Sequence, residues 1–293
     1  MQETQQSSEA TPTLLPTSSS TSIPITWSEP PVTKKLPLIE MFGPTVQGEG
    51  HMIGQQTYFI RLGGCDYACK LCDSLHAVDP NEIHNRAEWL TQDQLYKHFK
   101  DYVYKPGSTR WVTISGGNPA IHNLTRLCYL LTSNNFLIAT ETQGTIFADW
   151  LYAVDIITVS PKTPSMERFE PDIFQPFLGK LRGRPGLNVK VVIFNASDLK
   201  VATQILKIAE QYTLDYSRLF LSQGNPYIPY PGSRRSSVQW HSWHPGDDIG
   251  AHRQALADQY KTLFGLLSED AYLNQFKFLP QLHVWLHGNQ QGV

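Results

Sequence analysis

Short apolar segments alternate with longer segments of helical periodicity through most of this 293-residue chain. The short segments are rich in β-branched and aromatic residues, which predicts strands, and the longer ones repeat apolar residues every three or four positions, which predicts helices. Repeated strand–helix units predict an α/β fold with parallel strands and helical crossovers. The predicted strands cover 36–42, 57–62, 111–115, 136–140, 156–159, 187–194, 219–221 and 276–279.

Polar loops, several of them rich in Gly, Ser or Asn, follow the predicted strands. They cover 116–119, 141–145, 160–162 and 222–225. In parallel α/β folds, ligands bind at the carboxyl ends of the strands. The loops therefore predict one shared site, although the periodicity does not identify its chemistry.

Several helix boundaries and buried faces can also be predicted. Thr91 and Gln94 form a capping box at the start of a helix that continues through Val103. The helix at 198–212 should bury an inward face made of Val201, Ile205, Ile208 and Tyr212. The helix at 251–267 should bury an apolar face made of Leu256, Tyr260, Leu263, Phe264 and Leu267.

Three of the four cysteines, Cys65, Cys69 and Cys72, lie in one short loop with the spacing C-x3-C-x2-C. Soft thiolates gathered in this way suit iron–sulfur or zinc, and closed sites of either kind usually have four protein ligands. Three local thiolates without a fourth favour a [4Fe–4S] cluster with one open iron, and a structural metal knuckle is the alternative. Cys128 lies on the apolar stripe of a predicted helix and should pack in the core.

Composition narrows the class of protein. The net charge is -2 and no basic stripe stands out, which does not favour a nucleic-acid partner. No apolar run approaches the roughly 18 residues that span a bilayer, and no signal-peptide pattern is visible. Clustered cysteines of this kind do not indicate a secreted disulfide framework, so we expect a cytoplasmic protein. Residues 1–35 predict a disordered tail rich in Ser, Thr and Pro, and 36–293 predict a single catalytic domain.

The segment 43–50 is a polar loop punctuated by glycines. One interpretation is a turn between two strands. The other is a backbone that approaches a ligand, with Gln47 and Glu49 as hydrogen-bonding arms. Arg61 ends the strand before the cysteine loop, either as a surface charge or as a fork for a substrate carboxylate.

The cysteine spacing resembles that of the radical S-adenosylmethionine (SAM) superfamily. A narrower resemblance comes from the order of several motifs: 45–50, Arg61, the cysteine loop, 116–119, 141–145, 160–162 and 280–283. In this combination the chain resembles the 7-carboxy-7-deazaguanine synthase family of queuosine and 7-deazapurine biosynthesis. The resemblance runs from about Pro37 to the C-terminus.

This resemblance implies a compact, incomplete (β/α) barrel of the radical SAM type and a homodimer. It implies conversion of 6-carboxy-5,6,7,8-tetrahydropterin to 7-carboxy-7-deazaguanine with loss of ammonia, by a magnesium-assisted radical ring contraction. A reduced [4Fe–4S] cluster would split SAM, and the deoxyadenosyl radical would take a substrate hydrogen and later return it, so SAM would be a true cofactor. A reducing partner such as flavodoxin or ferredoxin would supply the electron.

The resemblance also implies roles for individual residues. The cluster would be held by Cys65, Cys69 and Cys72, and magnesium would be ligated by Ser74. SAM would contact Leu71, Asp73, Gly117, Asn118, Ser160, Pro161, Lys162, Ser222, Gln223, Gly224 and Asn225. The substrate would contact Val46, Gln47, Gly48, Glu49, Arg61 and Ser115, with Arg61 paired bidentately to the pterin carboxylate.

Four positions depart from the family pattern. Ser74 and Ser115 stand where the family often has Thr, so a hydroxyl is kept. Leu71 stands where radical SAM loops often have an aromatic residue, so adenine would pack on an aliphatic side chain. Asn118 replaces a common glutamate, and its amide would bond the methionine amino group without a charge.

The resemblance weakens through 227–274, which we interpret as an insertion. Within it, His241 and His244 have a metal-like spacing. Nothing else nearby in the sequence offers ligands, so a loop anchored by tryptophans is the favoured interpretation.

Three alternatives fit parts of the sequence. A glycyl-radical-activating enzyme shares the cysteine spacing but acts on a partner protein, whereas the segment 47–50 together with Arg61 favours a small anionic substrate. A non-catalytic scaffold would hold zinc with the same thiolates. An RNA-binding protein is disfavoured by the mild acidity of the chain.

Overall fold

The structure is a computed structural model that describes residues 34–212, 216–226, 249–288, 290 and 292. Three sequence predictions fall wholly or largely outside the described residues. They are the tail at 1–35, the histidine pair His241 and His244, and the part of the predicted insertion at 227–248.

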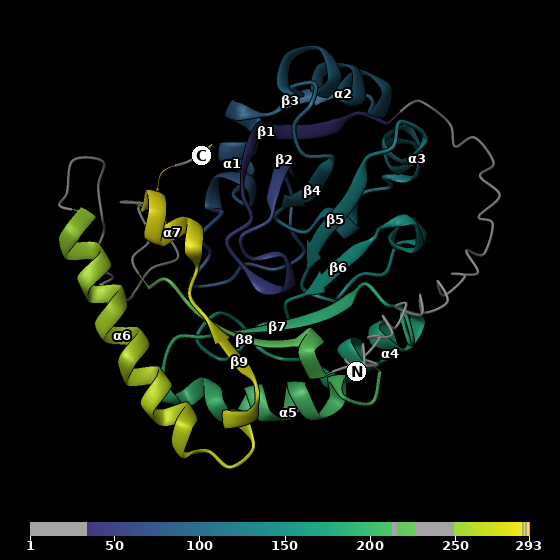
Figure 1. The fold of residues 1–293 in the computed structure, drawn as a ribbon. Coiled ribbons are helices and arrows are strands. Elements are labelled where there is room, and N and C mark those ends of the chain that lie inside the picture. The colour runs from purple at the N-terminus through teal and green to yellow at the C-terminus, as the bar shows by residue number, and fades with distance from the viewer. Residues whose placement is uncertain (1–33, 213–215, 227–248, 289, 291, 293) are drawn as a thin grey trace, which may run out of the picture.

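One open sheet of nine strands organises the described part of the chain (Figure 1). The strand order is β3-β1-β2-β4-β5-β6-β7-β8-β9. Strand β2 and strands β4 to β9 run parallel, β1 is antiparallel to β2, and β3 is antiparallel to β1. The strands are β1 (Leu36–Val46), β2 (Gln56–Leu62), β3 (Glu88–Leu90), β4 (Trp111–Gly116), β5 (Leu137–Thr142), β6 (Ile156–Val159), β7 (Leu187–Ile193), β8 (Leu219–Gln223) and β9 (Lys277–Leu279).

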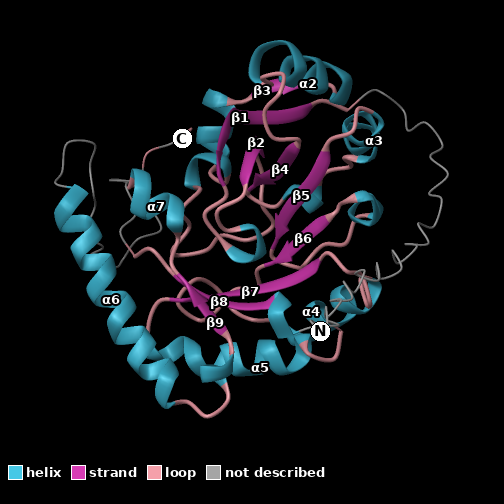
Figure 2. Cartoon of the chain, in the orientation of Figure 1, coloured by secondary structure: helices cyan, strands magenta, loops and turns pink. Residues whose placement is uncertain are grey.

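Helices connect the parallel strands, and α3, α4 and α5 lie on the outer side of the curved sheet (Figures 1 and 2). The connection from β5 to β6 differs, because it contains only the short 3-10 helix η5 (Asp149–Ala153). None of the described helices is long and apolar enough to cross a membrane. The α-helices are α1 (Pro80–Arg86), α2 (Gln92–His98), α3 (Thr125–Ser133), α4 (Pro171–Lys180), α5 (Leu199–Ala209), α6 (Ile249–Glu269) and α7 (Leu282–His287).

This curved, mainly parallel sheet confirms the predicted α/β class and the incomplete barrel. Each predicted strand is present, with bounds that differ by a few residues. The described part of the segment 227–274 forms α6 and the 3-10 helix η8 (Leu273–Gln275), and it leads from β8 into β9.

Strand β1 is longer than predicted and includes residues 43–46, which we expected in the following loop. Pairing with β2 explains the difference, because Thr45 lies opposite Thr57 after an irregularity that begins at Phe42. Pro44 lies within this irregularity. A proline is tolerated there because its missing N–H removes no regular hydrogen bond between the strands. The predicted substrate loop therefore begins at the end of a strand that is fixed in the sheet.

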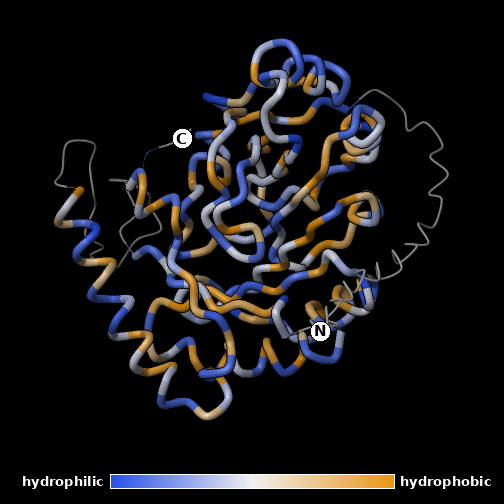
Figure 3. The backbone as a smooth tube through the Cα atoms, in the orientation of Figure 1, coloured by the Kyte–Doolittle hydropathy of each residue, from blue (hydrophilic) through white to orange (hydrophobic). Residues whose placement is uncertain are grey.

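The main core lies between the sheet and the outer helices. Strand β7 is buried along its whole length, and its side chains alternate between two environments. Val189 and Val191 belong to the main core, whereas Lys190 and Val192 line a cavity on the other face. In Figure 3, hydrophobic and hydrophilic residues alternate along α6, as expected for a helix with one buried face.

The buried face of α5 is rotated from the predicted one. Ile205 is buried as predicted, but the other buried positions are Ala202, Leu206 and Ala209. The remaining predicted residues are only partly buried against the core: Val201, Ile208 and Tyr212. Two alanines on the buried face allow the helix backbone to approach the sheet closely, and larger residues then lie at its margins.

Two further side-chain predictions can be compared with the structure. Cys128 is fully buried in the core on α3, as predicted. In α6, Leu256, Leu263 and Leu267 are buried as predicted. The prediction for Phe264 was wrong, because this side chain is 52% exposed and stacks beside Tyr260.

The capping box of α2 gives a direct test of the local folding signal. The Thr91 hydroxyl accepts from the backbone N–H of Gln94, and the Gln94 side chain accepts from the backbone N–H of Thr91. We expect Thr91→Ala to lower the free energy of unfolding by about 1 kcal/mol, because one helical N–H loses its acceptor. Chemical denaturation measures this, and Thr91→Ser, which keeps the hydroxyl, should remain close to wild type. Equal losses in both variants would contradict the capping role.

Candidate active site

A cavity of about 240 Å³ opens inside the curved sheet at the carboxyl ends of the parallel strands. This is the shared location predicted from the loops that follow the strands. Most of the predicted site residues line it. They are Val46, Gln47, Gly48, Glu49, Arg61, Cys65, Cys69, Leu71, Cys72, Asp73, Ser74, Ser115, Gly117, Ser160, Lys162, Gly224 and Asn225.

Four residues predicted to contact SAM do not line this cavity. Asn118 is fully buried, and its amide bonds side chains of neighbouring loops on both sides. Gln223 is buried and donates to a backbone carbonyl of α6. Ser222 is buried within β8, and Pro161 lies outside the lining. None of these four residues is part of the cavity lining, and their contact with SAM stays a prediction.

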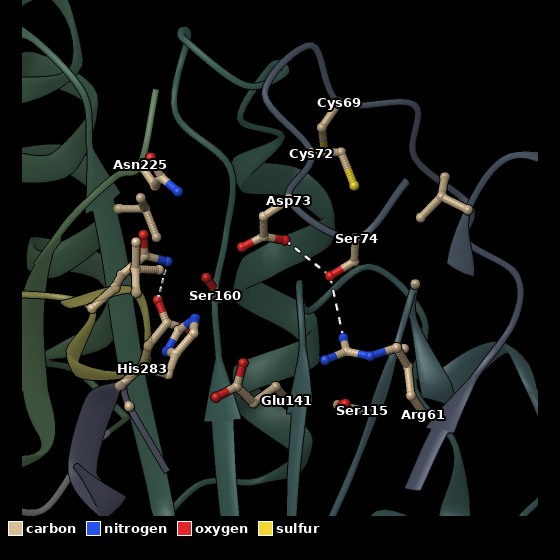
Figure 4. Close-up of a pocket in the computed structure, with 18 of the residues that line it drawn as sticks. Arg61, Cys69, Cys72, Asp73, Ser74, Ser115, Glu141, Ser160, Asn225 and His283 are labelled. Atoms are coloured by element: carbon tan, nitrogen blue, oxygen red, sulfur yellow. Dashed lines mark hydrogen bonds between the residues drawn. The ribbon is translucent and has the colours of Figure 1, made fainter. Parts of the chain in front are cut away.

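The cysteine loop lines one end of the cavity, as Figure 4 shows for Cys69 and Cys72. Cys69 is buried in a small apolar cluster that also contains Leu71 and Phe194. Burial raises the pKa of Cys69 to about 11 and that of Cys72 to about 12. Metal binding requires the thiolate, so a bound cationic centre must compensate the cost of these buried charges.

The donor set at this end of the cavity is three cysteine thiols. A zinc ion holds each sulfur at about 2.3 Å, so its ligands must converge on one point. Among the residues that the structure describes, no three His, Cys, Asp or Glu side chains are placed to hold one metal ion. A [4Fe–4S] cluster distributes its thiolates over different iron atoms. Three separate thiols around one end of a cavity suit that distribution.

A carboxylate inside the cysteine loop anchors the loop to the sheet. Asp66 Oδ1 accepts from Asn118 Nδ2 at 2.8 Å and from Gln143 Nε2 at 2.6 Å. Asp66 Oδ2 accepts from Thr145 Oγ1 at 2.5 Å. These donors follow β4 and β5, so two strand ends hold the loop through one side chain. Asn118 therefore helps to hold the cysteine loop, and its contact with the methionine amino group stays a prediction.

Close backbone packing completes this anchor. A Cβ atom at Gly117 would lie 2.2 Å from the carbonyl oxygen of Gly64, well inside van der Waals contact. The next residue, Asn118, donates its backbone N–H to that same carbonyl at 2.8 Å. Glycine is therefore needed at 117 so that the loop after β4 can lie against the cysteine loop.

Arg61 lies in the cavity wall with its charge partly compensated. Its Nε pairs with Glu40, which also contacts His76 at 3.4 Å. Burial alone would raise the pKa of Glu40, but the His76 hydrogen bond and the Arg61 charge lower it. Arg61 Nη1 donates to Ser74 Oγ at 3.2 Å, and Ser74 donates to Asp73 at 3.0 Å (Figure 4). Glu40 therefore holds the guanidinium at Nε, and the rest of the guanidinium faces the cavity.

Ser115 gives the clearest sign of an absent partner. Its Oγ is buried and has no hydrogen-bond partner among the described residues, although Ser115 lines the cavity. A buried hydroxyl without a partner costs about 1–3 kcal/mol. A polar ligand group beside Arg61 and Ser115 would remove that cost.

A buried ion-pair hub occupies the opposite wall. Lys190 Nζ lies 2.6 Å from Glu49 Oε2 and 3.4 Å from Glu141 Oε2. Glu49 also accepts from Gln281 Nε2 at 2.6 Å, and Glu141 accepts from Gln47 Nε2 at 3.3 Å. Burial opposes both charges, but the attraction is larger, so the pKa of Lys190 is raised and that of Glu49 is lowered. The hub joins β5, β7, the loop after β1 and the segment after β9.

The loop after β1 packs directly on the segment that begins α7. A Cβ atom at Gly48 would lie 2.1 Å from His283 Nδ1, so only glycine fits there. The Gly48 carbonyl accepts from the backbone N–H of Leu282 at 2.9 Å. The loop backbone thus packs closely on the protein at Gly48, which lines the cavity together with His283, and its approach to a ligand stays a prediction.

No model of a protein family matches the chain. The chain is 36% identical over 269 residues to 7-carboxy-7-deazaguanine synthase of Bacillus subtilis, covering 89% of this chain and 100% of that protein. It is 35% identical to the synthase of Bacillus cereus, covering 88% and 99%. The chain belongs to the 7-carboxy-7-deazaguanine synthase family.

A solved structure shares the fold of this 7-carboxy-7-deazaguanine synthase family member. The crystal structure of QueE from Escherichia coli superposes with a TM-score of 0.55 and 22% sequence identity, covering 85% of this chain and 95% of that one. The similarity supports the incomplete barrel. The family resemblance read from the motifs is therefore confirmed by whole-chain comparison.

Sequence reasoning missed several residues of this family member's cavity. Lys190 and Glu40 line it from within predicted strands, and Glu141 and His283 line it from motifs to which no role was given. A signal for Lys190 was present, since a lysine in the middle of a Val-rich strand is out of place in an apolar core. Its carboxylate partners could not be found from the sequence, because they lie 49 and 141 positions away.

The ion-pair hub predicts a large stability loss when its cation is removed. Lys190→Met should lower the free energy of unfolding by about 3–5 kcal/mol, because the buried carboxylate of Glu49 and the partly buried one of Glu141 would be left without a counter-charge. Denaturant titration at neutral pH measures the loss. Lys97→Met removes an exposed pair with Asp101 and should leave stability nearly unchanged. A wild-type stability in Lys190→Met would contradict the hub.

The hub also predicts a pH dependence with a defined sign. The pKa of Glu49 lies below its ordinary value of 4.5 in the folded protein, so its contribution is present above pH 4.5 and is lost as the pH falls through the folded value. In Lys190→Met burial without the lysine should raise the pKa of Glu49, so its protonation relieves the unpaired charge, and the stability difference between variant and wild type should narrow as the pH falls. Thermal unfolding between pH 3 and 7 (roughly the carboxyl range) compares the two. Identical acid profiles would refute this assignment.

Proposed function

We propose that this chain converts 6-carboxy-5,6,7,8-tetrahydropterin to 7-carboxy-7-deazaguanine with loss of ammonia. The observation that carries the proposal is the shared cavity: the cysteine loop, Arg61 and the unpartnered Ser115 hydroxyl all line it. One end suits a thiolate-held cluster, and the other suits a small anionic substrate. Membership of the 7-carboxy-7-deazaguanine synthase family supports the same reaction.

Cys65, Cys69 and Cys72 would hold a [4Fe–4S] cluster with an open iron for SAM. When bound and reduced, this pair of cofactors supplies the radical that takes a hydrogen atom from the pterin. SAM would contact residues of the cavity wall near the cysteine loop, which include Leu71, Asp73, Gly117, Ser160, Lys162, Gly224 and Asn225. The apolar cluster of Leu71, Met166, Val192 and Phe194 offers a dry surface for adenine where an aromatic loop residue is missing.

The chain's own residues would bind and orient the pterin. Arg61 presents the edge of its guanidinium that Glu40 does not use, so a carboxylate can pair with it there. Ser115 would satisfy its hydroxyl on the same ligand. Glu141, held by Gln47 and Lys190, presents a carboxylate that can accept N–H groups from the ring. Together these three side chains would exclude water from the pterin and fix which face of its ring is turned toward the cysteine loop.

Magnesium would be held weakly by protein and mainly by waters and substrate oxygens. Ser74 Oγ and the Asp73 carboxylate lie side by side at the cavity edge, 3.0 Å apart. Magnesium is commonly bound through one or two protein oxygens and keeps several waters. We further propose a cytoplasmic homodimer that receives electrons from a flavodoxin or ferredoxin.

The deciding experiment is anaerobic turnover of reconstituted protein with the tetrahydropterin, SAM, magnesium and dithionite. Mass spectrometry should find a product lighter than the substrate by one ammonia, with SAM not consumed stoichiometrically. Cys69→Ala should lose iron, sulfide and turnover, whereas Cys128→Ala should keep all three because Cys128 lies in the core. Zinc without sulfide in the wild type would overturn the proposal in favour of a metal scaffold. Cleavage of SAM with an intact pterin would retain the radical chemistry and remove the substrate assignment.

The role of Arg61 can be tested by changing its side chain and by removing the carboxylate from the substrate. Arg61→Lys keeps the charge but loses bidentate pairing, so we expect KM to rise about 10- to 100-fold, corresponding to a charge-assisted hydrogen bond of about 1.5–3 kcal/mol. Steady-state kinetics measures the change. A tetrahydropterin without the carboxylate should bind equally weakly to both proteins. An unchanged KM would show that the carboxylate is recognised elsewhere.

A further inference from the structure

We propose that the side-chain amide of Gln143 donates a hydrogen bond to the thiolate of Cys65 and thereby raises the reduction potential of the cluster. The inference rests on the proposed function, since it needs Cys65 to be a cluster ligand. It assigns a positioning and tuning role to a residue of the loop after β5 that the sequence motif left without one.

The geometry of the amide is specific. Gln143 Nε2 lies 3.5 Å from Cys65 Sγ and 2.6 Å from Asp66 Oδ1. The side chain is buried, with 6% of its surface exposed, so water competes little for these bonds. One amide nitrogen carries two hydrogens, and the two acceptors use both.

Asp66 fixes which end of the amide faces the sulfur. An ionised carboxylate only accepts hydrogen bonds, so it selects the NH₂ group of Gln143 over the carbonyl oxygen. Asp66 is itself fixed by Asn118 and Thr145. The orientation of the Gln143 amide therefore does not depend on a free choice of rotamer, and a donor is held at Cys65 before any cluster binds.

A donor at this sulfur has a predictable electronic effect. Reduction adds negative charge to a cluster and its thiolates, and a hydrogen bond to a ligand sulfur stabilises the more negative state. Cys65 Sγ also accepts from the backbone N–H of Tyr67 at 3.4 Å. That bond is part of the cysteine loop itself, whereas the Gln143 bond comes from the loop after β5 and can be removed by a single substitution.

The test measures the midpoint potential of the reconstituted cluster by redox titration followed by electron paramagnetic resonance. Gln143→Met removes the donor at similar length. We expect a threefold to tenfold shift of the equilibrium toward the oxidised cluster, a lowering of about 30–60 mV for one electron. Thr145→Val is the matched control, because it removes a bond to Asp66 and leaves the amide at Cys65. Its potential should stay at the wild-type value.

The outcomes separate the possible failures. An unchanged potential in Gln143→Met would overturn the inference, and so would an equal shift in Thr145→Val, since that would indicate loop positioning alone. If Gln143→Met holds no cluster, Gln143→Asn decides by the same criterion, because its shorter amide withdraws from the sulfur. A wild-type protein that binds no iron and sulfide would instead refute the proposed function, on which the inference depends.

Discussion

A buried lysine between two carboxylates joins the parts of this molecule that are farthest apart in the chain. Lys190 on β7 bonds Glu49 from the loop after β1 and Glu141 at the end of β5. Gln281, near the C-terminus, bonds the same Glu49. Because a buried charge is tolerated only with its partners in place, each segment must be correctly folded before the others are stable. The cavity wall is consequently set by electrostatics as much as by apolar packing.

A second polar cluster holds the cysteine loop, and its central group is a carboxylate instead of a lysine. Here one carboxylate, Asp66, collects donors from the loops after β4 and β5, and Gly117 allows the backbones to touch. Both polar clusters include residues at or just after the end of β5, so the same strand end positions the cysteine loop and the carboxylate of Glu141. A radical reaction requires its reacting groups to be held at close range, and this shared positioning serves that requirement.

The curved sheet allows both polar clusters to coexist with a stable apolar core. Alternate residues of β7 face opposite sides, so Val189 and Val191 join the helices while Lys190 faces the cavity. The same period brings Arg61, Ser115 and Glu141 to the carboxyl ends of three other strands. Polar residues therefore gather on the inside without weakening the apolar outer layer.

The sequence alone predicted most of the strands, several of the helices and a chemical type for the site, because these depend on residues close together in the chain, whereas β3, α1 and α4 were not predicted. Periodicity predicted the parallel strands, the Thr91 capping box predicted the start of α2, and the spacing of Cys65, Cys69 and Cys72 pointed to a cluster. Motif order pointed to the family, which whole-chain comparison confirmed.

Only the tertiary structure decided which polar residues face one another. Asn118 and Gln223 carry motif positions yet are committed to internal hydrogen bonds, and Lys190 carries no motif yet joins three segments. The exposure of Phe264 likewise could not be predicted, since helical periodicity predicts which face is buried but not how far around the helix the burial extends. Such pairings depend on contacts between residues distant in sequence, and local patterns carry no information about them.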